Sequence, residues 1–264
     1  ARTGPDMDFP AFPVAFYPVA VFAILLTGIA KGGFGGGSGG VAVPLMSIYI
    51  APPEAAAIML PILCAMDLFG VHAYRGLWSR RHLAILLPGA IVGIVAGAFA
   101  FGALPVDAIR LLIGGIAVAF ALNRWFRLSE RLAEHLATSS QPPGTPAGAF
   151  WGAVSGFTST LAHAGGPPFA IYLLPQKLDK TAFVATSVVF FLIVNYVKLV
   201  PYWFLGQLNT GNLAASLLFA PLAPVGIWLG VWLHRRIPET AFYRVAYGLL
   251  FVTGAKLVWD ALAP

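Results

Sequence analysis

Long apolar stretches recur along the whole chain and constrain its fold more than any other feature. A stretch of roughly 18 or more apolar residues can cross a bilayer as a helix, and such stretches follow one another from residue 11 to residue 262. Only 10% of the residues are charged, whereas an ordinary soluble domain carries about a quarter. Because a lone strand cannot satisfy its backbone groups in lipid, each crossing must be helical. The sequence therefore predicts an all-α, polytopic transmembrane helical bundle.

Proline, glycine and charged residues divide the apolar sequence into short and long segments, and one polar stretch separates these into two sets. We predict helical segments at 11–30, 41–51, 54–75, 82–102, 106–126, 146–162, 167–176, 180–204, 211–234 and 239–262. The predicted units are an N-terminal tail (1–10), a first transmembrane repeat (11–126), a cytoplasmic linker (127–145) and a second transmembrane repeat (146–264).

The two halves resemble each other in the order of their glycines and prolines, which indicates an internal repeat. Offsets of 133 and 123 residues pair Pro88, Gly93, Gly97 and Pro105 with Pro221, Gly226, Gly230 and Pro238, and Gly33, Pro44 and Tyr49 with Gly156, Pro167 and Tyr172. Glycines in membrane helices often allow close helix packing. We expect that role for Gly93, Gly97, Gly114 and Gly115.

The stretch KGGFGGGSGG at residues 31–40 holds seven glycines in ten positions, between two apolar segments. Segment 41–51 is too short for a comfortable crossing, so a fold-back is predicted: a helix, a glycine-rich tip and a half-helix. With one such hairpin in each half, eleven lysines and arginines lie on one side and only four toward the other, which makes the first side cytoplasmic. Each half then crosses an odd number of times. The prediction is two inverted repeats, each with a broken or re-entrant helical hairpin.

Inverted repeats with interrupted helices are the arrangement of secondary transporters, whose sites lie where the breaks meet. A half-helix that restarts at the tip directs unpaired N–H groups there, and such a terminus attracts anions. Hydroxyls, amides and cations near both tips would add further donors. The candidate substrate-binding residues are Lys31, Gly32, Gly33, Gly36, Gly37, Ser38, Gly39, Gly40, Thr158, Ser159, Thr160, His163, Gly165, Gly166, Asn195 and Lys198.

Ionisable side chains inside membrane segments are costly and are candidates for function. Asp67 lies deep in its segment, and we expect it either to carry a proton or partner a basic side chain, or to be a buried packing residue. His72 is the second proton-coupling candidate, with an interfacial histidine as the alternative. Asn195, Lys198 and Tyr202 share one helix face by their spacing, although Lys198 could instead snorkel to the membrane surface.

Several motifs together resemble the TauE/SafE family of sulfite and organosulfonate exporters. They are GIAKGGFGGGSGGVAVPLMSIYI (28–50), the alanine-rich helix start at 53–57, VHAYRGLWSRRHL (71–83) and a weaker second copy of the first motif, in which STLAHAGGPP (159–168) replaces the glycine run. The likeness covers essentially the whole chain. It implies transport of a small sulfur-containing anion, such as sulfite or sulfoacetate, across the bacterial inner membrane.

The resulting hypothesis is a multi-pass inner-membrane secondary transporter that exports its anion by alternating access. Proton coupling and a homodimeric assembly are left open. The expected partners are the anion and membrane lipids, without nucleic acid, and no cofactor or metal is expected because no His or Cys pair has ligand spacing. One alternative is a passive anion channel. Another is an intramembrane serine protease that uses Ser38 of Gly36-Gly37-Ser38-Gly39 with His72 or His163 as base.

Overall fold

The computed structural model describes residues 12–33, 39–128, 130–132, 144–234, 236 and 239–263, and this part of the chain is helical, with no strand. The helices of the first half are α1 (Phe16–Gly33), η1 (Gly39–Val41), α2 (Ala42–Met46), α3 (Pro52–Ala73), α4 (Arg80–Ala103) and α5 (Val106–Phe126). Those of the second half are α7 (Thr145–Ala162), α8 (Gly166–Leu173), η2 (Leu174–Gln176), α9 (Lys180–Phe204), α10 (Thr210–Phe219), α11 (Leu222–His234) and α12 (Glu239–Leu262).

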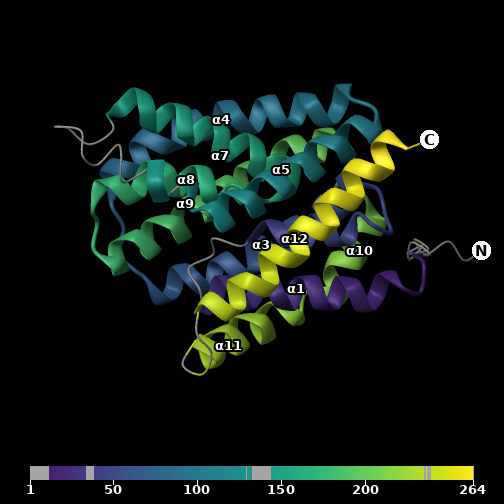
Figure 1. The fold of residues 1–264 in the computed structure, drawn as a ribbon. Helices are drawn as coiled ribbons and strands as arrows, with labels where there is room; N and C mark the ends of the chain where they lie inside the picture. The colour runs from purple at the N-terminus through teal and green to yellow at the C-terminus, as the bar shows by residue number, and fades with distance from the viewer. Residues whose placement is uncertain are drawn as a thin grey trace, which may run out of the picture.

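Six stretches of the described chain are long and apolar enough to cross a membrane. They are Pro52–His72, Arg80–Ala103, Val106–Phe126, Thr181–Phe204, Thr210–Leu233 and Arg244–Leu262. The prediction of an all-helical, multi-pass membrane protein is confirmed. Helix α1 starts and α12 finishes at one end of the molecule, while α5 finishes and α7 starts at the other (Figure 1).

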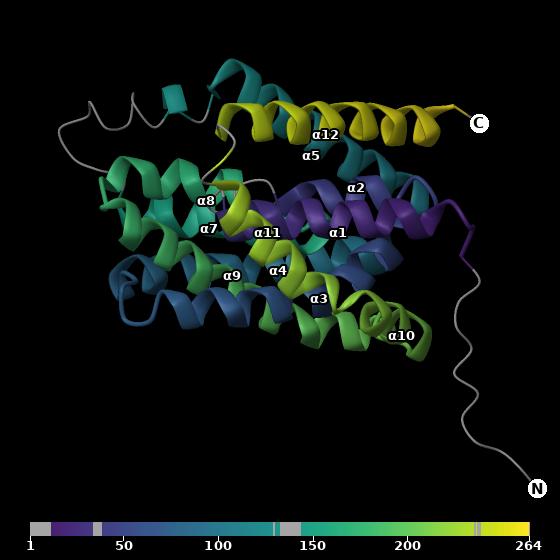
Figure 2. The ribbon, with the colours of Figure 1, turned by 90° about the horizontal axis from the view of Figure 1, so that it is seen from below.

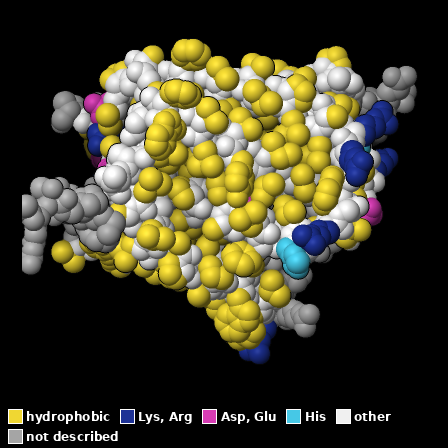
Figure 3. All heavy atoms as spheres, turned by 180° about the vertical axis from the view of Figure 1, so that it is seen from behind, with side chains coloured by type: hydrophobic (Ala, Val, Ile, Leu, Met, Phe, Trp, Pro, Cys, Tyr) yellow, Lys and Arg dark blue, Asp and Glu magenta, His cyan; other side chains and the backbone are white. Residues whose placement is uncertain are grey.

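Lysine and arginine side chains gather at one end of the molecule, and the broad face between the ends is apolar (Figure 3). The connections after α3 and η2 and the end of α5 lie there, so we refer to it as the basic end. By the positive-inside rule this end is predicted to face the cytoplasm.

The two halves interlock instead of packing as separate units. The most extensive helix contacts are α4 with α7, α1 with α11 and α5 with α12, and α3 also packs on α9. Each of these pairs joins one helix of the first half to one of the second, and Figure 2 shows α5 with α12 and α1 with α11.

Glycines set the distance between the paired helices. A Cβ atom on Gly93 of α4 would lie 1.9 Å from the carbonyl oxygen of Ala153 in α7, and one on Gly156 of α7 would lie 2.1 Å from that of Ala90. Gly28 and Gly226 meet in the same way where α1 crosses α11. Packing of this kind lets backbones approach closely and is typical of membrane helices.

The predicted packing role is confirmed for three of the four glycines named for it and is wrong for Gly115. Gly97 contacts Thr160, and Gly114 contacts Gly254. A Cβ atom on Gly115 would meet nothing within 4 Å, and this residue is exposed.

The predicted segments agree with the helices except at 41–51 and 211–234. In the first, η1 and α2 end at Met46 and residues 47–50 form turns. The second is predicted as one segment. The structure divides it into α10 and α11 at Ala220 and Pro221. Pro221 has no N–H to donate to the preceding helical turn. Just before it, the N–H of Ala220 donates to the carbonyl oxygen of Leu217, three residues back, at 3.3 Å. After the break α11 packs on α1, whereas α10 packs on α3.

We predict that Gly93→Ala destabilises the protein by about 1–3 kcal/mol, the usual cost of overpacking, because the added methyl group must push α4 away from α7. Thermal or denaturant unfolding in detergent micelles measures this change. The matched control is Gly115→Ala, whose methyl group meets open space. Equal stability of the two variants would contradict the assigned packing.

Candidate functional site

The two helix breaks meet inside the bundle. The first lies between α1 and η1 and includes residues 34–38, which are outside the described part of the chain, and the second lies between α7 and α8. A Cβ atom on Gly40 would lie 2.6 Å from the Cβ atom of Ala164, so the two breaks touch at a position that excludes a side chain. Residues 120 or more positions apart in the chain thus form one site.

The end of α7 is held in an unusual conformation. His163 caps the helix with φ 51°, a left-handed conformation that is uncommon for residues other than glycine. Its N–H donates to the carbonyl of Ser159 at 3.0 Å, and the hydroxyl of Ser155 donates to the carbonyl of Gly165 at 2.7 Å. Strained residues of this kind persist where the surroundings fix them, often at functional sites.

One part of the site is an ion pair buried against an amide. The Lys31 ammonium, on the last turn of α1, donates to Oδ1 of Asp67 in α3. Nδ2 of Asn195 in α9 donates to Oδ2 of the same carboxylate at 2.6 Å. Asp67 is 3% exposed, and the Lys31 side chain is 14% exposed. Both oxygens of the Asp67 carboxylate therefore accept from nitrogen donors on two different helices.

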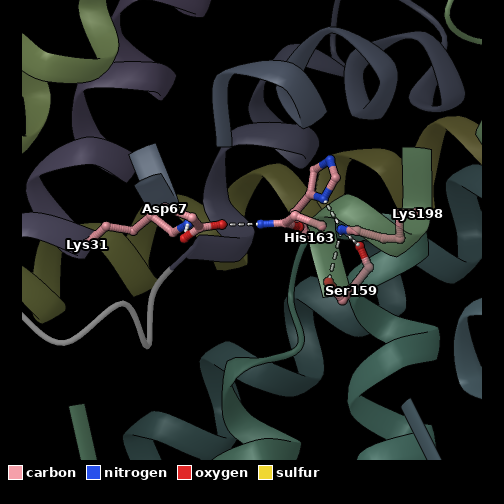
Figure 4. Close-up of polar contacts among 6 residues, drawn as sticks. Lys31, Asp67, Ser159, His163 and Lys198 are labelled. Carbon is pink, nitrogen blue, oxygen red and sulfur yellow. Dashed lines mark hydrogen bonds and ion pairs between the residues drawn. The ribbon is translucent and has the colours of Figure 1, made fainter. Parts of the chain in front are cut away.

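The other part is a fully buried lysine. Nζ of Lys198, 0% exposed on α9, donates to the carbonyl oxygen of Ser159 at 3.0 Å, to Oγ of Ser159 at 3.0 Å and to Nδ1 of His163 at 2.7 Å. Nε2 of His163 lies 2.9 Å from the carbonyl oxygen of Ala56, which can only accept, so Nε2 carries the proton. Figure 4 places Lys31 and Asp67 on one side and Ser159, His163 and Lys198 on the other.

Both parts border one cavity of about 150 Å³. Its polar lining is Lys31, Asp67, Tyr74, Ser159, His163, Ser187 and Asn195, and its apolar wall includes Leu63, Phe69, Val184, Val188, Phe191 and Val231. Phe69 and Tyr74 are at the end of α3, and Val184 and Val188 are near the start of α9, so the cavity extends from the centre toward the basic end. A small anion in this space would meet the Lys31 ammonium and hydroxyl and amide donors within apolar surroundings.

Many of the candidate residues from the sequence come together here. Lys31, Gly32, Asp67, Ser159, His163, Gly166 and Asn195 all line the cavity. Lys198 does not line the cavity itself but contacts Ser159, which does. Because Lys198 is completely buried, its ammonium does not reach the membrane surface, and the snorkelling alternative is excluded. Gly39 and Gly40 are at the restart of the first broken helix, and Gly165 packs against Ser155.

Other candidates lie elsewhere or outside the described part of the chain. The hydroxyls of Thr158 and Thr160 donate to carbonyl oxygens of their own helix. Thr158 donates to Val154 at 2.9 Å, and Thr160 donates to Gly156 at 2.8 Å. Gly33 is the last residue of α1. His72 is exposed near the end of α3, and its proton-coupling role stays a prediction. Gly36, Gly37 and Ser38 lie outside the described residues.

Three further polar residues belong to the site and were not among the candidates. Ser187 and Tyr74 line the cavity, and Tyr202 donates its hydroxyl to the carbonyl of Thr160 at 2.6 Å. Ser187 could have been found from the sequence, because it lies eight residues before Asn195 and so on the same face of α9. Among the described residues no group of three His, Cys, Asp or Glu side chains could hold a metal ion.

Comparison with known proteins agrees with a transporter. A curated protein of Comamonas testosteroni, named a probable inner membrane transporter protein TsaS, is 28% identical over 202 residues, which cover 76% of this chain and 80% of that protein. No solved structure matches at a significant level. The family model described as sulfite exporter TauE/SafE matches residues 20–257. Since this family and the relative are transporters, the predictions of a non-enzymatic, multi-pass inner-membrane protein are confirmed, and the chain belongs to the TauE/SafE family of membrane transporters.

Proposed function

We propose that this protein exports a small sulfur-containing anion, sulfite or an organosulfonate such as sulfoacetate, across the bacterial inner membrane by alternating access. The anion would bind in the central cavity beside Lys31, Ser159, His163 and Asn195. The sulfur chemistry and the direction are taken from the family, whose description is that of a sulfite exporter.

The observation that carries this proposal is the charge inside the cavity region. Lys198 is a buried lysine and Lys31 a part-buried one, whereas Asp67 is the one carboxylate among the described residues that contacts either of them. Burying a charge in an apolar interior is unfavourable unless an opposite charge compensates it. An anion bound here would supply that compensation, and the hydroxyl of Ser159 would supply a donor.

The internal repeat supports alternating access. The α4–α7 and α1–α11 pairs exchange with each other when the halves are exchanged. Counted from the first residue of each helix, Asp67 is residue 16 of α3 and Asn195 is residue 16 of α9, and these two hydrogen-bonded residues therefore occupy equivalent places. The opposite directions of the two halves in Figure 1 agree with inverted repeats. In such transporters one repeat rocks against the other around a central site.

The position of the cavity favours a carrier over a passive channel. Along α3 the residues that line the cavity begin at Leu63, and the last of them is Tyr74, directly after the helix at the basic end. In the opposite direction along the same helix, residues 55–60 are completely buried. A cavity that reaches one end while the other end is closed is the arrangement that alternating access requires.

We predict that sulfite, sulfoacetate or another organosulfonate raises the thermal unfolding temperature of the purified protein. A ligand that binds only the native state at 100 times its Kd adds about 2.7 kcal/mol. Lys31→Met should lose this stabilisation because it removes a cation from the cavity wall. The control is Lys256→Met, an exposed lysine paired with Asp260 at 2.7 Å near the end of α12.

Two results would count against the site. Stabilisation by none of sulfite, sulfate, sulfoacetate, isethionate or taurine would contradict the proposed substrate class. Equal stabilisation of Lys31→Met and Lys256→Met would remove Lys31 from the site.

The proposed proton coupling is assigned to Asp67, because protonation of its carboxylate would release the Lys31 ammonium. Asp67→Asn should change the pH dependence of anion transport in proteoliposomes while anion binding is largely retained. Loss of binding together with an unchanged pH profile would contradict this assignment.

Transport against a gradient separates the carrier from the channel. We expect an imposed proton gradient to drive accumulation of the anion in proteoliposomes, and a protonophore to abolish it. Anion flux that only follows its own gradient, unaffected by the protonophore, would favour the channel.

A further inference from the structure

We propose that Lys198 takes up a proton when the anion binds, and that the hydroxyl of Ser159 links the two events. The inference rests on the proposed function of the same cavity and adds a proton-binding group to it. It concerns the binding step, whereas the proton coupling assigned to Asp67 concerns the release of Lys31 during transport.

The three hydrogen-bond partners of Lys198 suit both protonation states of its amine. As an ammonium group, Nζ donates to the carbonyl oxygen of Ser159 and to Oγ of Ser159, each at 3.0 Å, and to Nδ1 of His163 at 2.7 Å. A neutral amine has two protons and a lone pair, so it would donate to the Ser159 carbonyl and to His163 and accept from the Ser159 hydroxyl. Every contact is then kept, and only the bond between Nζ and Oγ of Ser159 reverses its direction.

Of these three partners, only the Ser159 hydroxyl can follow the protonation state of Lys198. Nε2 of His163 holds its proton toward the carbonyl oxygen of Ala56 at 2.9 Å, so Nδ1 has only a lone pair and accepts in either state. The carbonyl oxygen of Ser159 also can only accept. A hydroxyl, in contrast, both donates and accepts.

The direction of that bond decides what Ser159 offers to the cavity. Ser159 lines the cavity, and Lys198 contacts it there (Figure 4). When Nζ donates to Oγ, the hydroxyl proton is free to be donated to a bound anion. When the hydroxyl donates to Nζ instead, Oγ presents only lone pairs to the cavity. An anion that accepts from Ser159 therefore selects the protonated form of Lys198.

The groups that face Lys198 leave its charge without a carboxylate partner. Its side chain is 0% exposed, and among the described residues none of its hydrogen-bond partners is a carboxylate. The titratable groups that interact with it at longer range are Cys64 and Asp67 of α3 and Lys31 of α1, and Asp67 is already paired with Lys31. In α4, the titratable residues are confined to the first three positions, at the basic end, and α7 has none.

The positive charge of Lys198 thus depends on the anion. An isolated charge in an apolar interior is unfavourable, and a buried amine can release its proton instead. A bound anion supplies the missing opposite charge. By thermodynamic linkage the effect is reciprocal: the anion favours proton uptake, and lower pH tightens anion binding. The linkage applies to singly and doubly charged anions alike.

The test counts the protons that enter the protein when an anion binds. Binding of isethionate and sulfoacetate is measured calorimetrically in Tris and in triethanolamine, two cationic buffers that differ in ionisation enthalpy and do not compete with the anion. These sulfonates are chosen because, unlike sulfite, they do not exchange protons near neutral pH. The proteins are wild type, Lys198→Met, Lys198→Arg, Ser159→Ala and Asp67→Asn, with the exposed Lys256→Met as the control. Thermal unfolding checks that each variant is folded.

The linkage predicts a distinct result for each protein. Wild type should take up about one proton per bound anion where uptake is greatest, and its affinity should fall about tenfold per pH unit as the pH rises through that range. Lys198→Arg holds a positive charge that cannot be released, so it should bind without uptake and with a flat pH profile. Lys198→Met should bind about tenfold more weakly, also without uptake.

The remaining variants separate the hydroxyl link from the carboxylate. Ser159→Ala should bind the anion more weakly and take up fewer protons than the wild type, because it lacks the hydroxyl that connects the anion to Lys198. Asp67→Asn and Lys256→Met should take up as many protons as the wild type. Undiminished uptake in Ser159→Ala would contradict the link, and this variant decides the matter if neither substitution at Lys198 gives a folded protein.

The other contradicting results leave anion transport in place. Binding by the wild type without proton uptake overturns the inference, and so does uptake that persists in Lys198→Met or Lys198→Arg. Uptake that disappears in Asp67→Asn overturns it too, because the proton would then belong to that carboxylate. Failure of the wild type to bind either sulfonate also overturns the inference, and failure to bind sulfite and sulfate as well overturns the proposed function.

Discussion

The interaction on which the rest of this structure depends is the compensation of charge inside an apolar bundle. Asp67 and Lys198 are buried, and Lys31 is part-buried, among helices that are mostly apolar. In such surroundings each charge needs a partner or several hydrogen bonds. Asp67 has two donors from different helices, and Lys198 has three acceptors from the end of α7. These bonds connect α1, α3, α7 and α9, so the functional centre is also a point where the fold is fixed.

The helix pairs that pack through glycines determine where that centre lies. Close contact of α4 with α7 and of α1 with α11 brings the end of α7 and the end of α1 to the middle of the bundle. The breaks that follow these two helices then meet at Gly40 and Ala164. Because each pair takes one helix from each half, neither half could form the site alone. The two halves of the chain are therefore not independently packed.

Much of this arrangement could be predicted from the sequence, since hydropathy locates the helices and charge marks their cytoplasmic ends. The deep positions of Asp67, Asn195 and Lys198 follow from counting along their segments. The partner of each could not be predicted, because the contact between Lys31 and Asp67 depends on how α1 and α3 pack, which no local pattern states. Proline also gave an incomplete signal: Pro61, Pro88 and Pro201 lie within continuous helices, whereas the helix breaks at Pro221.

The hydroxyl groups near the second break show what a finer use of periodicity can add. Thr158, Ser159 and Thr160 are adjacent in sequence, but successive helical residues point about 100° apart. Only Ser159 lines the cavity, and it lies one turn before His163 on the same face. The hydroxyls of Thr158 and Thr160 return to carbonyls of α7 itself. Helical spacing from a single residue known to face the site would have selected Ser159 and excluded its neighbours.

A difference between the halves bears on how a repeated sequence can support transport. Pro88 and Pro221 are paired in the predicted repeat, yet α4 continues through Pro88 while the chain breaks between α10 and α11 at Pro221. Helix α4 rests along α7 over its length, whereas α10 and α11 divide their contacts between α3 and α1. Equivalent sequences thus take different shapes in different packing. If the halves exchanged these shapes, the closed and open ends of the cavity would exchange with them, which is the change that alternating access needs.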